Sequence, residues 1–66
     1  MKTVGVIGLG NMGMGMAKNF IKKGFQTKGY DVFAPKLEQF GQEGGIPCTS
    51  PAQVGDGADV VFVMVL

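Results

Sequence analysis

Three glycines separate two stretches of the sequence whose apolar residues follow different periods, and this junction restricts the fold more than any other feature. Residues 3–9 form a continuous apolar run rich in β-branched side chains, which predicts a strand buried on both faces. Residues 11–23 repeat apolar side chains at intervals of three and four, which predicts an amphipathic helix. A buried strand that turns directly into a helix is typical of α/β proteins with a parallel sheet. The glycines are Gly8, Gly10 and Gly13.

The rest of the chain continues the same alternation of strands and helices. A second strand is predicted over residues 25–30, followed by a helix that has Pro35 in its first turn and several glycines at its end. Pro47 has no N–H to donate to a neighbouring strand, so residues 46–48 are predicted to form only a short edge strand. A short third helix and a final apolar strand over residues 59–66 complete the pattern.

Local signals at the third helix and in the last strand predict the topology. Ser50 is placed as the N-cap of the helix, with Pro51 in the first helical position and Gln53 completing a capping box. Residues 59–66 are the most apolar run, so we expect a central strand beside the first one. The proline-containing strand then lies outside the second. The predicted fold is therefore α/β, a Rossmann-type doubly wound parallel sheet with strand order 3-2-1-4.

The end of the sequence lies within its most apolar run, and no predicted helix follows to cover that strand. An uncovered apolar edge strand is a template for pairing with other chains. We therefore expect residues 1–66 to form the N-terminal part of a larger domain, truncated with respect to the complete sheet.

Composition excludes several classes of function. Six lysines and five acids leave a net charge of +1, so neither nucleic acid nor a membrane is an expected partner. The chain has no histidine and no arginine, and its single cysteine is Cys48. A Ser-His-Asp triad, an internal disulfide and a zinc site therefore cannot be assembled from it. We expect no metal site and no catalytic residue in the sequence, and a lone cysteine suits the reducing cytoplasm.

The spacing of the three glycines matches G-x-G-x-x-G, the pattern of a dinucleotide-binding turn. The first glycine permits a tight turn, the second leaves room for a pyrophosphate, and the third allows close packing of the helix. The N–H groups of the first helical turn then bind phosphate without a cationic side chain. The motif alone is weak, since glycine-rich turns are common. The candidate cofactor-binding residues here are Gly8, Leu9, Gly10, Asn11, Met12 and Gly13.

A dinucleotide site also needs an acidic residue roughly 20 residues after the glycines, where it binds the adenosine ribose hydroxyls. Asp31 has this position, at the end of the second predicted strand. The alternative is a solvated acid in a turn. A carboxylate there accepts a hydrogen bond from the 2′-hydroxyl of NAD and repels the 2′-phosphate of NADP. Because Val32 adds no positive charge and the chain lacks arginine, NAD is the expected cofactor and NADP is less favoured.

The last residues of the chain are further candidates for the cofactor site. If the final strand lies beside the first, its carboxyl end faces the glycine loop across the switch point of the sheet. Val65 and Leu66 would then border the cofactor. Met12 and Met16, at helical spacing, are predicted instead to fill the core with their side chains, and Cys48 is predicted to be a small buried residue.

With these motifs, the chain resembles the β-hydroxyacid dehydrogenases, the family that includes 3-hydroxyisobutyrate dehydrogenase and 6-phosphogluconate dehydrogenase. The resemblance rests on residues 6–13 (VIGLGNMG), 16–20 (MAKNF), 22–24 (KKG), 50–54 (SPAQV) and 58–61 (ADVV). Phe20 stands where the family usually has leucine, and Met64-Val65-Leu66 stands where it often has Met-Leu-Pro. Gly29, shortly before the acidic residue, and Val65 are more similar to the L-threonate dehydrogenase branch.

The resemblance implies an NAD(P)-dependent oxidoreductase that transfers a hydride from a small β-hydroxyacid to the nicotinamide. In the family, the lysine that acts as general acid/base and the serine-glycine substrate loop lie well beyond residue 66, as does a helical C-terminal domain. The resemblance thus implies that residues 1–66 are inactive alone and that the full-length enzyme is a homo-oligomer. The alternative is a stand-alone nucleotide-binding or regulatory module without redox turnover.

Overall fold

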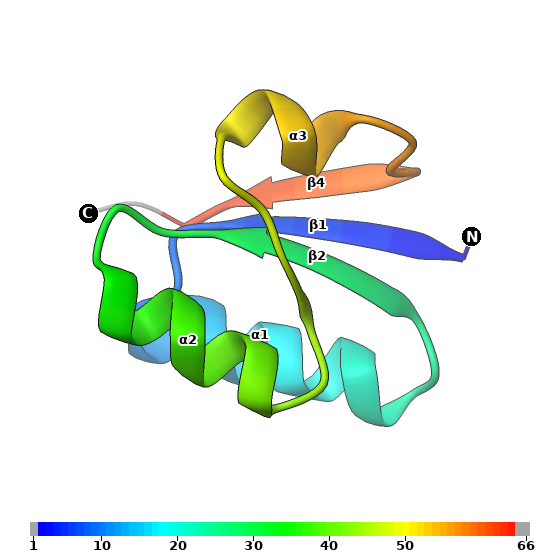
Figure 1. The fold of residues 1–66 in the computed structure, drawn as a ribbon. Coiled ribbons are helices and arrows are strands. Elements are labelled where there is room, and N and C mark those ends of the chain that lie inside the picture. The colour runs from blue at the N-terminus through cyan, green and yellow to red at the C-terminus, as the bar shows by residue number, and fades with distance from the viewer. Residues whose placement is uncertain (1, 65–66) are drawn as a thin grey trace.

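The computed structural model describes residues 2–64, which form a parallel four-stranded sheet with helices on both faces (Figure 1). The strands are β1 (Thr3–Ile7), β2 (Gln26–Tyr30), β3 (Ile46–Pro47) and β4 (Val60–Val63). The helices are α1 (Asn11–Lys22), α2 (Ala34–Gln42) and α3 (Pro51–Gly55). The strand order is β3-β2-β1-β4, which confirms the predicted α/β class and topology.

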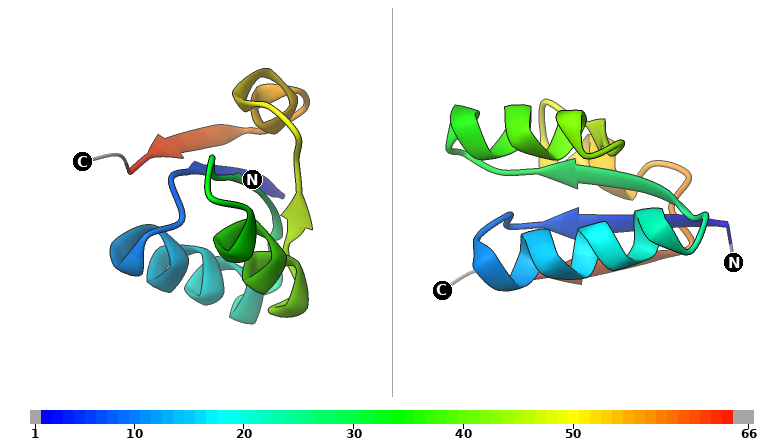
Figure 2. Two further views of the ribbon diagram at one scale, coloured as in Figure 1. Left: turned by 60° about the vertical axis from the view of Figure 1, so that its left-hand side comes forward. Right: turned by 90° about the horizontal axis from the view of Figure 1, so that it is seen from below.

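Helices α1 and α2 cover one face of the sheet, and α3 covers the other (Figure 2). Alternation along β1 supplies both faces, because successive side chains of a strand point in opposite directions. Val6 packs on the side of α1 and α2, where it belongs to the main core cluster. Gly5 faces α3, since a Cβ atom on Gly5 would lie 2.5 Å from Val54 Cγ1. The buried residues of the main cluster are Val6, Leu9, Met14, Ala17 and Phe40.

Gly29 lies in the middle of β2, where glycine is normally unfavourable, and the packing of α2 explains its presence. The ring of Phe40 is fully buried directly over this position. A Cβ on Gly29 would lie 2.6 Å from the ring, and a Cβ on Gly45 would lie 2.3 Å from it. The two missing side chains therefore create the space that the largest buried side chain of the core occupies.

The face that α1 buries differs from the prediction. Met12 was expected in the core but is 75% exposed, and Met16 is only half-buried. The buried positions of α1 are Gly13, Met14 and Ala17. The face of α1 that lies against the sheet includes Gly13 and Ala17, so Met14, on the Ala17 side of Gly13, is buried and Met12, on the other side, is exposed. The prediction for Cys48 is confirmed, since its side chain is 2% exposed.

The ends of the helices largely follow their local signals. Gly24 ends α1 with a φ of +92°, a conformation that favours glycine. Ser50 caps α3 as predicted, because its Oγ accepts a hydrogen bond from Gln53 N at 3.2 Å. The second half of the capping box is displaced by one residue, since Gln53 Oε1 accepts from Thr49 N–H at 2.6 Å instead of from Ser50 N–H.

Strand β4 pairs with β1 as predicted, with Val6 opposite Phe62. Among the described residues it lies at the edge of the sheet, as the predicted order 3-2-1-4 requires, and the central position expected for it refers to the complete sheet. Val63 is 60% exposed. The ring of Phe62 stacks on Phe20 of α1 at a centroid distance of 5.5 Å. At the opposite end of the strand, Asp59 Oδ2 accepts hydrogen bonds from the backbone N–H groups that begin β1.

Candidate dinucleotide-binding site

The glycine loop leaves the carboxyl end of β1 and leads into α1, at the end of the sheet where the strands finish (Figure 1). Gly8 has a φ of +97°, which side chains of L-residues rarely permit. Its N–H donates to the carbonyl of Tyr30 at 2.9 Å, so the parallel pairing of β1 with β2 extends into the loop. Carboxyl ends of parallel strands are where ligands bind to open α/β sheets.

Gly13 is the position where the helix and the loop come closest. A Cβ atom on Gly13 would lie 1.9 Å from the Gly8 carbonyl oxygen, far inside any permitted contact. The same atom would lie 3.5 Å from Met64 Cβ. The third glycine of the motif thus allows close packing, as the sequence predicted, and the structure identifies the Gly8 carbonyl as the group it packs against.

Gly10 differs from the other two glycines, because the described chain does not require glycine there. It is the N-cap of α1 with φ −68° and ψ −170°, angles that any residue adopts. A Cβ on Gly10 would meet no atom of residues 2–64 within 4 Å, apart from its chain neighbours. The space in front of the helix is therefore open, as a phosphate group needs.

The start of α1 presents backbone donors to this open space. The first helical hydrogen bond runs from Met14 N to the Gly10 carbonyl at 2.7 Å. The N–H groups that precede it have no acceptor within a helix, and Gly10 carries no side chain to cap them. Asn11 and Met12 are exposed at this end. The arrangement fits a phosphate anion, which would accept these hydrogen bonds. The positive end of the helix dipole would stabilise its negative charge.

Asp31 follows β2 and lies against the glycine loop, which brings together the two motifs predicted from the sequence. Its Oδ2 accepts a hydrogen bond from Leu9 N at 2.7 Å, and its Oδ1 accepts one from Phe33 N at 2.8 Å. The carboxylate therefore connects the loop after β1 with the loop after β2. The sequence placed Asp31 in the site but did not predict either of these backbone contacts.

A small cavity of about 100 Å³ lies beside this carboxylate, lined by Ile7, Gly8, Tyr30, Asp31 and Val32. Val32 is 88% exposed and Phe33 is 58% exposed, so this edge carries large apolar side chains that the described chain leaves open. Sequence reasoning did not single out Phe33. Its position two residues after a strand-ending aspartate is the available signal. Val65 and Leu66, also predicted to border the cofactor, lie outside the described residues.

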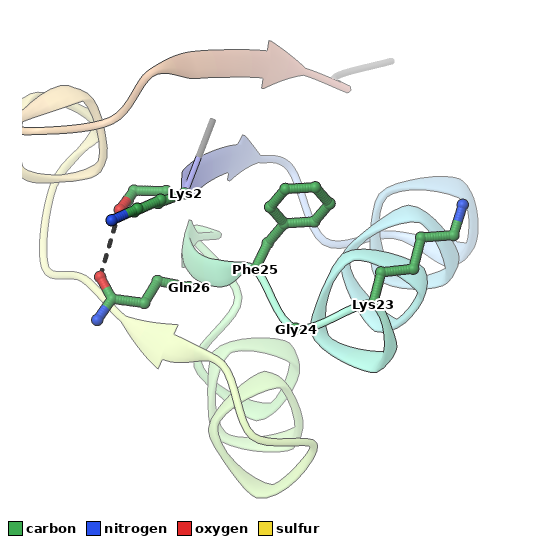
Figure 3. A pocket seen from close by; sticks show the side chains of 6 residues that line it. Lys2, Lys23, Gly24, Phe25 and Gln26 are labelled. Carbon is green, nitrogen blue, oxygen red and sulfur yellow. Dashed lines mark hydrogen bonds between the residues drawn. The ribbon is translucent and has the colours of Figure 1, made fainter.

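A larger open cavity of about 400 Å³ lies at the opposite, amino-terminal end of β1 and β2 (Figure 3). Figure 3 shows side chains from the start of both strands and from the end of α1 around it. This end of a parallel sheet is not where α/β proteins bind nucleotides, and the glycine loop is remote from it. The lining residues are Lys2, Thr3, Lys23, Gly24, Phe25 and Gln26.

Metal-binding clusters and membrane-spanning helices are both absent from the part of the chain that the structure describes. Among residues 2–64, no three side chains of His, Cys, Asp or Glu lie together in a group that could hold a metal ion. Within the same residues, no helix has both the length and the apolar character needed to cross a membrane.

Comparison with known protein families shows which kind of domain contains this glycine loop. Residues 3–66 match the family described as the NAD binding domain of 6-phosphogluconate dehydrogenase. The chain belongs to this family. The match extends over both motifs of the site, the glycine loop and the acidic residue after β2. The expected resemblance to the β-hydroxyacid dehydrogenases and the expectation of NAD as cofactor are therefore confirmed for this NAD-binding segment.

Curated relatives of this NAD-binding segment include several dehydrogenases. L-threonate dehydrogenase of Cupriavidus necator is 42% identical over 65 residues, which are 98% of this chain and 22% of the relative. Mitochondrial 3-hydroxyisobutyrate dehydrogenase of Rattus norvegicus is 48% identical over 61 residues, which are 92% of this chain and 18% of the relative. The chain thus spans about a fifth of the length of the curated relatives it matches.

Solved structures agree with the family assignment. The 3-hydroxyisobutyrate dehydrogenase of Mycobacterium tuberculosis with L-serine superposes with a TM-score of 0.94 at 31% identity, over 98% of this chain and 22% of that one. An imine reductase variant from Myxococcus stipitatus in complex with NAD+ gives a TM-score of 0.94 at 24% identity, over 100% of this chain and 23% of that one. The second similarity shows the shared fold.

Proposed function

We propose that this chain binds the adenosine diphosphate half of NAD within a dehydrogenase that oxidises a small β-hydroxyacid. The observation that supports this proposal most is the contrast between Gly13 and Gly10. The chain itself fills the space next to Gly13, whereas the space next to Gly10, at the open end of α1, contains no atom of residues 2–64 within 4 Å. When bound, NAD accepts a hydride from the alcohol carbon of the substrate.

In this proposal the backbone binds the diphosphate and Asp31 binds the adenosine ribose. The N–H groups of Asn11 and Met12 are the phosphate donors, and the turn from Gly8 to Gly10 brings the phosphates close to the main chain. Each carboxylate oxygen of Asp31 accepts one backbone hydrogen bond and has a further lone pair for a ribose hydroxyl. Val32, Val65 and Leu66 remain predicted neighbours of the cofactor.

The preference for NAD over NADP follows from the charges at the ribose end of the site. A 2′-phosphate beside Asp31 would place two negative groups in contact, and the chain has no arginine to neutralise them. Lys28, one of the nearest lysines in sequence, donates to the Asp56 carbonyl at 2.5 Å and is therefore engaged at the end of α3. The described chain thus offers an acceptor for the 2′-hydroxyl. Lys36, the other lysine near Asp31 in sequence, belongs to α2, and we take it as a surface lysine.

The test of the phosphate site is a pair of valine substitutions in the complete gene product. A Cβ at Gly10 and a Cβ at Gly15 both lie in open space among the described residues. Gly10→Val fills the place of the diphosphate, so we expect NAD affinity to fall by at least about tenfold, measured by isothermal titration calorimetry. Gly15→Val, within α1 and away from the loop, retains wild-type affinity. Equal affinities for both variants would contradict the proposed function.

The remaining predictions concern the whole protein. Residues 1–66 are proposed as the N-terminal half of the NAD-binding domain, and the groups that handle the substrate lie elsewhere in the protein, as does the helical domain. A cytoplasmic homo-oligomer that acts on a small hydroxyacid, without nucleic acid or membrane partners, remains our prediction. Incubation of the complete gene product with NAD and a set of β-hydroxyacids tests the predicted dehydrogenase activity. Binding of NAD without formation of NADH would favour a regulatory module instead.

A further inference from the structure

The carboxylate of Asp31 is already occupied by the protein before any ligand is considered. Gly8 N donates to the Tyr30 carbonyl, which is the last bond of the backbone ladder between β1 and β2. The next N–H, that of Leu9, donates to Asp31 Oδ2 at 2.7 Å. A side-chain oxygen thus accepts the first backbone N–H of the loop beyond this ladder. The second oxygen accepts from Phe33 N at 2.8 Å, at the N-cap of α2.

Leu9 is the residue on which the shape of the glycine loop depends. It lies between Gly8, which has a positive φ, and Gly10, the N-cap of α1. Its side chain is fully buried in the core beneath the loop, and its N–H is held by Asp31. Two glycines flank this position and add no side-chain restraint of their own. The hydrogen bond to Asp31 is therefore a principal restraint on the loop backbone, beside the burial of the Leu9 side chain.

We propose that Asp31 is a positioning residue that holds the glycine loop in its phosphate-binding conformation through the hydrogen bond from Leu9 N–H. This role is additional to the contact with ribose and rests on the proposed function as an NAD site. A carboxylate suits it better than an amide does, because both of its oxygens accept hydrogen bonds. The amide group of an asparagine would instead direct N–H donors toward Leu9 N–H or Phe33 N–H.

The role has a consequence for cofactor preference. Replacement of Asp31 removes the repulsion of a 2′-phosphate, but it also releases the loop that binds the diphosphate of either dinucleotide. Single substitutions of Asp31 should therefore lower the affinity for NAD without producing tight binding of NADP. The loop effect is separable from the ribose effect, because it persists when the ligand has no ribose hydroxyls to contact.

The experiment compares NAD with an analogue whose adenosine ribose lacks both the 2′- and 3′-hydroxyls, in the complete gene product. Wild type, Asp31→Ala and Asp31→Glu are measured by calorimetry, with Glu38→Ala as a control that removes an exposed carboxylate from α2. Asp31→Glu keeps the charge and can still contact ribose, but its longer side chain no longer fits the short bond to Leu9. If Asp31→Ala fails to fold, Asp31→Glu alone tests the positioning role.

We expect both Asp31 variants to bind the analogue roughly tenfold more weakly than wild type does, which is the weight of one hydrogen bond to a charged group. Asp31→Glu should still distinguish NAD from the analogue, and Glu38→Ala should match wild type. If the Asp31 variants bind the analogue as wild type does, the positioning role is wrong while the NAD site stands. If wild type binds neither ligand, the proposed function fails.

Hydrogen exchange of the ligand-free protein tests the same role independently of binding. The Leu9 amide should exchange faster in Asp31→Ala than in wild type, whereas the Gly8 amide, which donates to Tyr30, should change less. Unchanged exchange at Leu9 would overturn the positioning role even if the affinities change.

Discussion

Alanine at Gly13 is the perturbation for which the structure gives the clearest magnitude. The new Cβ would lie 1.9 Å from the Gly8 carbonyl oxygen, whereas real Cβ atoms essentially never approach closer than 3.0 Å. The loop and α1 must therefore separate by about 1 Å, and both groups in contact belong to the backbone, which cannot rotate away. Overpacking of this kind costs about 1–3 kcal/mol of the free energy of unfolding.

Gly15→Ala is the matched control in the same helix. A Cβ at Gly15 meets no other part of the described chain within 4 Å, so the substitution should stabilise α1 by about 0.5–1 kcal/mol through helix propensity alone. Urea denaturation should therefore place the two variants on opposite sides of wild type. Gly13→Ala should also weaken NAD binding, because the loop is displaced. Equal stabilities for the two variants would refute the packing argument.

Two further predictions concern the core and the end of the sheet. Gly29→Ala should destabilise the protein by about 1–3 kcal/mol in urea denaturation, because its Cβ would lie 2.6 Å from the Phe40 ring; unchanged stability would contradict this packing. Hydrogen bonds from Thr3 N–H and then Lys2 N–H lower the pKa of Asp59 from its ordinary value of 3.8. Its stabilising contribution is therefore complete above pH 3.8 and is lost as pH falls through the lower folded-state pKa, so Asp59→Asn should lose this part of the acid dependence in unfolding curves.

Much of the fold was predictable because its signals are local. The alternation of apolar runs with helical periods predicted the order β3-β2-β1-β4, and Pro47 predicted the short edge strand. Ser50 and Gly24 predicted the start of α3 and the end of α1. The glycine motif and the position of Asp31 predicted that the site lies at the carboxyl end of the strands, since both follow parallel strands.

The errors and omissions concern contacts between segments distant in the sequence. Met12 and Met14 are both apolar and flank Gly13 on opposite sides, and Met14 is the buried one because the face of α1 against the sheet includes Gly13 and Ala17. Helical spacing alone does not determine which of these faces lies against the sheet. The bond between Leu9 and Asp31 joins two loops, so neither loop's sequence predicts it.

A structure of the complete gene product with NAD bound tests the central claim most directly. We expect the diphosphate oxygens at about 2.7–3.2 Å from the N–H nitrogens of Asn11 and Met12. We also expect an adenosine ribose hydroxyl to donate to Asp31, while Leu9 N–H keeps its bond to the same carboxylate. A diphosphate bound away from the first turn of α1, or a glycine loop in a different conformation with Leu9 N–H turned from Asp31, would contradict this claim.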